Sequence, residues 1–296
     1  MRPSSTARLL LVTAAVLFST GGAAIKATAF SAYQVASLRS GIAALTLLLL
    51  IPAARRGWSW RALAVGVTYA ATLFLFVVAN KLTTSANTIF LQSTAPLYLL
   101  VLAPWLLREP LRLKDVWFMV AVGVGLALFF VTRDAPVATA PDPFTGNLLA
   151  AISGVTWALT LIGLRWLGST NGGESQYPAM VAGNALVFIV VLPLALPLAQ
   201  STPLDWGVII YLGAIQIGVA YACLAKGIRD VPAVEASILL LVEPALNPLW
   251  AWGIHGEVPS VLALTGAGII FGATVVRSVM ESREARARSG DLRVES

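Results

Sequence analysis

The chain has 296 residues, of which 58% are hydrophobic and 11% are charged, and its formal net charge at pH 7 is +6. Because about a quarter of the residues of a soluble domain are charged, this composition excludes an ordinary soluble enzyme and indicates a membrane protein with several spans. The positive charge then gives the orientation in the bilayer and does not imply a nucleic-acid partner.

Ten apolar segments follow one another along the chain, each close to the roughly 20 residues needed to cross the hydrocarbon. They are Leu9–Ile25, Gln34–Ile51, Arg61–Ala79, Ser85–Leu107, Asp115–Thr132, Gly146–Trp166, Ala179–Leu198, Asp205–Ala225, Ala233–Ile254 and Ser260–Val279. The alternation of a β-barrel is absent. We therefore predict an all-α integral membrane protein with ten transmembrane helices.

The first segment needs a separate argument, because Arg2 and Arg8 precede it and small residues follow its apolar run, as in a signal peptide. Its apolar run is long for a signal core. The end of this segment at Lys26 also aligns with the end of the sixth segment at Arg165. We therefore predict a retained helix.

Basic residues in the predicted loops fall mostly on one side of the membrane. With the N-terminus inside, 16 of the 20 Lys and Arg residues face the cytoplasm, whereas Lys26, Lys81 and Arg133 face outside and Arg39 lies within a segment. The positive-inside rule therefore places both termini in the cytoplasm.

The fourth and ninth segments share a pattern of interruption. Pro96 corresponds to Pro244 and Glu109 to Glu257, both at an offset of 148 residues (244 − 96), and Pro248 follows in the ninth segment. Interrupted helices at matching places in two halves indicate a transporter binding site. We expect helix breaks or hinges at the three prolines, and structural or gating roles for the two glutamates at opposite membrane surfaces.

The repeat divides the chain into two similar parts. Each part has five predicted helices, an odd number, so the second part must insert upside down relative to the first. We predict a first repeat at residues 1–132, an extracytoplasmic linker at 133–145, a second repeat at 146–279 and a charged cytoplasmic tail at 280–296.

These features resemble the EamA type of the drug/metabolite transporter superfamily. The resemblance rests on the five-plus-five organisation, on the paired proline-to-glutamate stretches and the sequence LLLVEPALNPLWAWGIHGE, and on Gly266 and Gly272 after Glu257. The eighth segment, with GVAYACLAKGI, is similar to the amino-acid exporters of the YddG kind. The resemblance implies a secondary exporter of amino acids or related metabolites in a bacterial inner membrane.

Two charged residues, Arg39 and Glu243, lie within predicted spans and away from the span ends. Glu243 directly precedes Pro244 at bilayer depth, where a carboxylate is costly unless it faces protein or water. It either binds a substrate amine or a coupling proton, or it stabilises backbone groups freed by the prolines, and the structural role is the favoured one. Arg39 either snorkels towards the headgroups, which is favoured, or pairs with Glu243 or a substrate carboxylate.

Polar and aromatic side chains near mid-membrane form the predicted substrate-binding layer. Amides supply both donors and acceptors for a zwitterion, and aromatic rings hold an apolar body and contact an ammonium group. Taken one at a time, these residues are more readily explained by packing. The candidates are Asn87, Gln92, Tyr98, Trp157, Gln216, Tyr221, Asn247 and Trp250.

The sequence as a whole predicts a secondary transporter that exports aromatic, hydrophobic and other amino acids by alternating access. We expect small-molecule cargo, a lipid bilayer environment, no cofactor or metal, function as a single chain, and a proton as a candidate co-substrate. The alternatives are export of drugs or of metabolites such as nucleotide sugars, an intramembrane enzyme, and a scaffold or receptor. Neither a metal-ligand set nor a Ser-His or Cys-His pair supports the enzyme.

Overall fold

The computed structural model describes residues 5–106, 113–131, 135–169, 176–198, 201–231 and 233–294, and their regular secondary structure is helical. Within these described ranges, eight helical spans are long and apolar enough to cross a membrane. They are α1 with α2 (Ser5–Ser19, Gly21–Lys26), α3 (Ala32–Leu50), α4 (Trp60–Leu82), α7 (Leu113–Val131), α8 (Pro143–Ser169), α9 (Tyr177–Ala195), α10 with η2 and α11 (Pro203–Ile210, Tyr211–Val219, Ala220–Asp230) and α14 (Val261–Val294). An all-α protein with several membrane spans is confirmed.

The fourth and ninth predicted segments are each divided into two helices. They form α5 (Ser85–Gln92) with α6 (Ala95–Leu106), and α12 (Ala233–Leu240) with α13 (Val242–His255). None of these four helices is long enough to cross the hydrocarbon by itself.

The two divisions lie just before the paired prolines, at Ser93 and at Leu241, again 148 residues apart (241 − 93). Pro96 and Pro244 consequently lie in the first turns of α6 and α13, where the missing N–H removes no helical hydrogen bond. Pro248 does not end a helix, because α13 continues through it. Both predicted divisions are therefore present, and each begins three residues before its proline (96 − 93; 244 − 241).

Two irregularities were not predicted from the sequence. The first span is interrupted at Thr20, between α1 and α2, and the span of α10 and α11 contains the π-helix η2. The last helix also continues to Val294, beyond the predicted end of its apolar segment.

Several helices begin at residues whose side chains satisfy the first free N–H groups. Ser31 accepts a hydrogen bond from the N–H of Gln34 at 3.3 Å, and the Gln34 side chain accepts one from the N–H of Ser31 at 3.0 Å. Thr84 accepts from the N–H of Asn87 at 3.1 Å at the start of α5. Such caps each stabilise a helix by about 1 kcal/mol.

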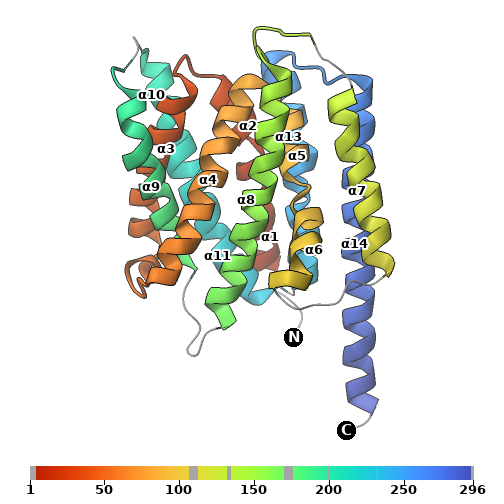
Figure 1. The fold of residues 1–296 in the computed structure, drawn as a ribbon. Helices are drawn as coiled ribbons and strands as arrows, with labels where there is room; N and C mark the ends of the chain where they lie inside the picture. Colours follow the sequence, from red (N-terminus) through yellow and green to blue (C-terminus); the bar gives the residue numbers. More distant parts are fainter. Residues whose placement is uncertain are drawn as a thin grey trace.

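The helices form one bundle, with α3, α9 and α10 on one side and α7 and α14 on the other (Figure 1). α4 packs against α8 and α9, α3 against α9, α1 against α11, and α7 against α14. The two marked ends of the chain lie at the same end of the bundle (Figure 1). The short 3-10 helix η1 (Pro52–Arg55) follows α3.

Candidate functional site

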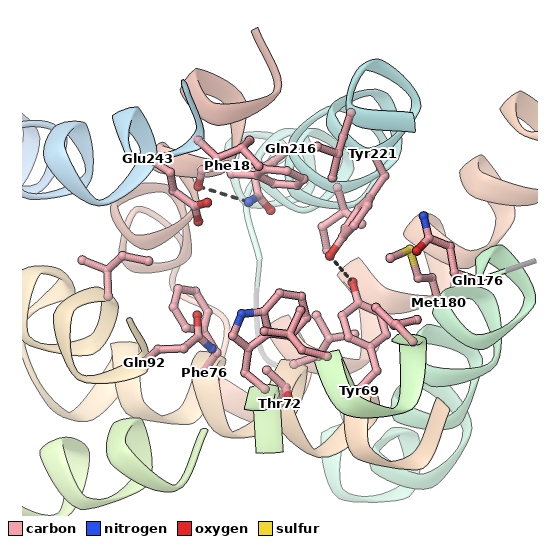
Figure 2. A pocket seen from close by; sticks show the side chains of 18 of the residues that line it. Phe18, Tyr69, Thr72, Phe76, Gln92, Gln176, Met180, Gln216, Tyr221 and Glu243 are labelled. Atoms are coloured by element: carbon pink, nitrogen blue, oxygen red, sulfur yellow. Dashed lines mark hydrogen bonds between the residues drawn. The ribbon is translucent and has the colours of Figure 1, made fainter. Parts of the chain in front are cut away.

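A cavity of about 390 Å³ lies inside the bundle, between helices of the first and the second half of the chain. Figure 2 shows side chains from both halves facing one another across it. Aromatic and polar lining residues are Phe18, Arg39, Tyr69, Thr72, Phe76, Gln92, Ser93, Trp157, Gln176, Tyr177, Gln216, Tyr221 and Glu243. Such a volume lies in the lower part of the range of small-molecule pockets.

Part of the predicted set lines this cavity and part does not. Gln92, Trp157, Gln216, Tyr221, Arg39, Glu243 and Pro244 line it. The described residues Asn87, Pro96, Tyr98, Asn247, Pro248, Trp250 and Glu257 are not among its lining residues. Glu109 lies outside the described residues.

A hydrogen-bonded tyrosine pair forms one wall. The hydroxyl of Tyr69 in α4 donates to the hydroxyl of Tyr221 in α11 at 2.9 Å (Figure 2). The Phe18 ring packs edge-on against Tyr221 with 5.0 Å between ring centroids, and Trp157 lies 6.3 Å from Tyr69. This wall is apolar on its faces and polar at the two hydroxyl groups.

Tyr69 and Phe18 were not selected from the sequence as binding residues. Tyr69 lies in the third predicted segment, close to Thr68 and Thr72, and the same mid-segment polarity that selected Tyr98 would have identified it. At the offset that aligns Lys26 with Arg165, Phe18 corresponds to Trp157 (157 − 18 = 139), a predicted binding residue, so the repeat indicates Phe18 as well.

Two amide side chains of the lining are held by neighbouring helices. Gln216, in the π-helix η2, donates to the carbonyl of Phe18 at 3.3 Å, close to the interruption between α1 and α2. Gln92, the last residue of α5, donates to Ser153 Oγ of α8 at 2.6 Å. Each residue thus ties an irregular stretch of helix to the cavity wall.

Three predicted binding residues instead stabilise helix ends. Asn247 donates to the carbonyl of Ser19 at 3.1 Å, and Trp250 donates to Ser19 Oγ at 2.9 Å, both at the end of α1. Asn87 is 1% exposed and donates to Oδ1 of Asn147 at 3.2 Å. The donor groups of these three residues bond to the protein's own backbone and side chains, and none of the three residues lines the cavity.

Tyr98 also packs away from the cavity lining. A Cβ atom placed on Gly154 of α8 would lie 3.0 Å from Cε2 of Tyr98 and 3.1 Å from the carbonyl oxygen of Leu91. The tyrosine therefore covers a glycine at the point where α8 meets the division between α5 and α6.

The charged residues Arg39 and Glu243 both line the cavity. Arg39 is only 2% exposed, and its Nε atom has no hydrogen-bond partner. The favoured prediction that Arg39 snorkels to the headgroups is wrong, because its position in the middle of α3 places the guanidinium against the cavity. The carboxylate of Glu243 points into the cavity beside Gln216 and Phe18 (Figure 2).

A buried ion pair joins Lys26, at the end of α2, to Glu257, which follows α13. Lys26 also donates to the carbonyls of Thr83, at 2.7 Å, and Thr139, and Glu257 accepts from the N–H of Ser85 at 2.9 Å. The sequence placed Lys26 at the interface, whereas the structure buries its ammonium because Glu257 and two carbonyls compensate the charge.

The cavity extends away from this ion pair, towards the opposite end of the bundle. Its lining includes Leu164 near the end of α8, Tyr177 at the start of α9 and Ala225 in α11, all of which lie towards the end of the bundle that carries the termini (Figure 1). The cavity therefore extends towards the end of the bundle that carries the termini.

Comparison of the sequence and the structure with known proteins connects this chain to a transporter family. The model of the EamA-like transporter family matches residues 5–131 and 144–279. Two proteins of Bacillus subtilis (strain 168) are similar to the chain: the uncharacterized transporter YyaM is 23% identical over 209 residues, 66% of this chain and 68% of its own length. The uncharacterized transporter YwfM is 25% identical over 247 residues, which are 80% of this chain and 79% of its own length. A solved crystal structure superposes with a TM-score of 0.61 at 21% identity, covering 95% of this chain and 99% of that one, which shows a common fold.

Proposed function

The chain belongs to the EamA-like transporter family of small-molecule membrane transporters, and we propose that it exports amino acids with aromatic or other apolar side chains from the cytoplasm. Family membership and the transporter relatives point to a transporter rather than an enzyme. The cargo, the direction of transport and the location in a bacterial inner membrane are proposed here in addition to the family.

The cavity is the observation that carries this proposal. Its volume of about 390 Å³ suits a molecule of amino-acid size and is small for a nucleotide sugar. Its walls combine aromatic rings, such as Trp157 and Tyr69, with the amides of Gln92 and Gln216. Rings of this kind hold an apolar side chain, and the amides donate to and accept from polar groups.

The direction of transport follows from the closed and open ends. The cavity is directed towards the end of the bundle that carries the termini (Figure 1), and the arginine-rich loops make this end cytoplasmic under the positive-inside rule. Cargo would thus enter from the cytoplasm. The Lys26–Glu257 pair closes the outer end in this state.

Alternating access requires parts that move as units. We take α5 with α6, and α12 with α13, each as one broken membrane crossing, which brings the number of crossings to ten. The divisions before Pro96 and Pro244 then act as hinges about which one half rocks against the other.

Flux across proteoliposomes tests the proposed function. Vesicles that contain the purified protein and internal unlabelled phenylalanine should accumulate external labelled phenylalanine by exchange, whereas protein-free vesicles should not. A panel that includes glycine, lysine, a nucleotide sugar and a cationic dye gives the cargo range. Flux of the dye or of the nucleotide sugar with none of any amino acid would overturn the amino-acid assignment.

A further inference from the structure

Two opposite charges line the cavity without neutralising each other. No ion pair or hydrogen bond joins the side chain of Arg39 or of Glu243 to another residue in the described part of the chain, and the two residues do not pair with each other. An unpaired charge at bilayer depth costs several kcal/mol. One pocket is therefore lined by a basic and an acidic side chain that have no hydrogen-bond or ion-pair partners among the described residues.

Arg39 is held in place by the backbone around it. A Cβ atom on Gly213 of η2 would lie 2.6 Å from the carbonyl oxygen of Arg39, so α3 and η2 are in close contact at this residue. Tyr69 and Tyr221 lie within electrostatic range of the guanidinium. Arg39 lines the cavity although it is only 2% exposed, and its buried Nε–H has no hydrogen-bond partner among the described residues.

Glu243 occupies the first turn of α13, where the helix dipole favours a carboxylate. A capping role would nevertheless require a hydrogen bond from a backbone N–H, and none reaches its side chain from the described residues. Its carboxylate faces the cavity (Figure 2) and lies within electrostatic range of Tyr221. Tyr221 lines the same cavity as both charged residues.

A zwitterion is the ligand whose charges match this arrangement. A cation would neutralise Glu243 and leave Arg39 unpaired, and an anion would do the reverse. A molecule with one carboxylate and one ammonium group compensates both, while Phe18, Trp157 and the tyrosine pair surround its apolar part. Charge-assisted hydrogen bonds are the strong ones available to such a ligand.

We propose that Arg39 binds the carboxylate and Glu243 the ammonium group of a zwitterionic amino acid, and that these two residues determine selectivity for zwitterions. This inference rests on the proposed function and assigns its two charge-recognition residues. It makes Glu243 a binding residue, in place of the structural role that the sequence favoured.

Binding to the full-length protein in nanodiscs tests the inference independently of flux. The ligands are phenylalanine, phenylalanine amide, which lacks the carboxylate, and 3-phenylpropionate, which lacks the amine. Wild-type protein should bind phenylalanine about tenfold or more tightly than either analogue, as expected for one lost charge-assisted contact. Equal affinity for all three would overturn the inference.

The variants assign each group of the ligand to a residue. Arg39→Gln should remove the preference for phenylalanine over phenylalanine amide, and Arg39→Lys should keep part of this preference. Glu243→Gln should remove the preference for phenylalanine over 3-phenylpropionate. Thr46→Val, on the same helix but outside the cavity, and Glu235→Gln, in the exposed pair with Arg8, should keep both preferences. If Arg39→Gln does not fold, the Arg39→Lys variant and the wild-type ligand series still decide the question.

The outcomes separate this inference from the proposed function. Selective binding of phenylalanine without flux would support the two charge-recognition residues and overturn amino-acid export. Flux of phenylalanine and its amide at equal rates, unchanged in the Arg39 and Glu243 variants, would support export and overturn the inference.

Discussion

The Nζ atom of Lys26 lies 2.6 Å from Oε1 of Glu257, and the two side chains are only 4% and 1% exposed. The pair connects the end of α2 to the segment after α13, while its further hydrogen bonds reach the end of α4 and the start of α5. Four elements thus meet at one buried ion pair, which connects them at the end of the bundle opposite the chain termini.

Removing one partner of this pair should strongly destabilise the protein. Glu257→Gln leaves the ammonium of Lys26 buried without its counter-charge, and the expected loss is about 3–5 kcal/mol. Lys26→Met should have a similar effect on the carboxylate. Thermal unfolding of the purified protein in detergent, followed by the apparent Tm, measures both changes.

The double variant Lys26→Met with Glu257→Leu should be more stable than either single variant, because no unpaired charge remains. Arg8→Gln provides the matched control: its bond to Glu235 is also 2.6 Å long, but the side chains are 45% and 34% exposed. Exposed pairs contribute at most about 1 kcal/mol. Equal losses at the buried and exposed pairs would contradict this account.

Trp157 and Tyr98 should respond differently to truncation, although the sequence suggested the same role for both. Trp157 lines the cavity and Tyr98 packs against Gly154 of α8. Trp157→Ala should reduce transport of aromatic amino acids relative to small ones, measured in competition for flux. Tyr98→Ala should lower the apparent Tm and leave the ratio of aromatic to small amino-acid transport unchanged. A change of cargo preference in Tyr98→Ala would argue against these separate roles.

Asn247 illustrates a polar residue with a structural function. Asn247→Ala leaves the carbonyl of Ser19 without its donor in a buried position, at a cost of about 1–3 kcal/mol. We expect a lower apparent Tm with unaltered discrimination between phenylalanine and its amide. Loss of that discrimination at constant Tm would instead return Asn247 to the binding site.

The interrupted helices could be predicted because proline and apolar run length are local signals. The divisions before Pro96 and Pro244 fall where the repeat predicts them. The interruption at Thr20 has no proline, and the π-helix at Tyr211–Val219 has no local marker. Both depend on tertiary contacts, such as the hydrogen bond between Thr20 Oγ1 and the Tyr211 hydroxyl at 2.7 Å.

The binding layer was predicted only in part, since depth in the membrane is readable from the sequence but the direction of a side chain is not. Gln92 and Asn247 are both amides in interrupted segments, yet only Gln92 lines the cavity. In nearly uniformly apolar helices the polar face is not marked by periodicity. Direction is set by packing between helices, as at Gly183, where α9 crosses α4.

Gly183 should be intolerant of even one added methyl group. A Cβ atom there would lie 2.7 Å from Cδ1 of Tyr69 and 2.8 Å from the carbonyl oxygen of Gly66, so α4 and α9 must separate or the tyrosine must move. Overpacking of this kind costs about 1–3 kcal/mol. Because Tyr69 forms part of the cavity wall, Gly183→Ala should lower both the apparent Tm and the affinity for phenylalanine.

The control for this substitution is Gly268→Ala in α14, where a Cβ atom would meet nothing within 4 Å. Alanine is favoured over glycine within a helix by about 0.5–1 kcal/mol, so this variant should be as stable as the wild type or slightly more so, with unchanged affinity. A combined Gly183→Ala and Tyr69→Leu variant should regain part of the lost stability by removing the contacted ring, while binding stays weak. Full recovery of phenylalanine binding in that variant would mean that Tyr69 only packs between the helices and that other residues form the wall of the site.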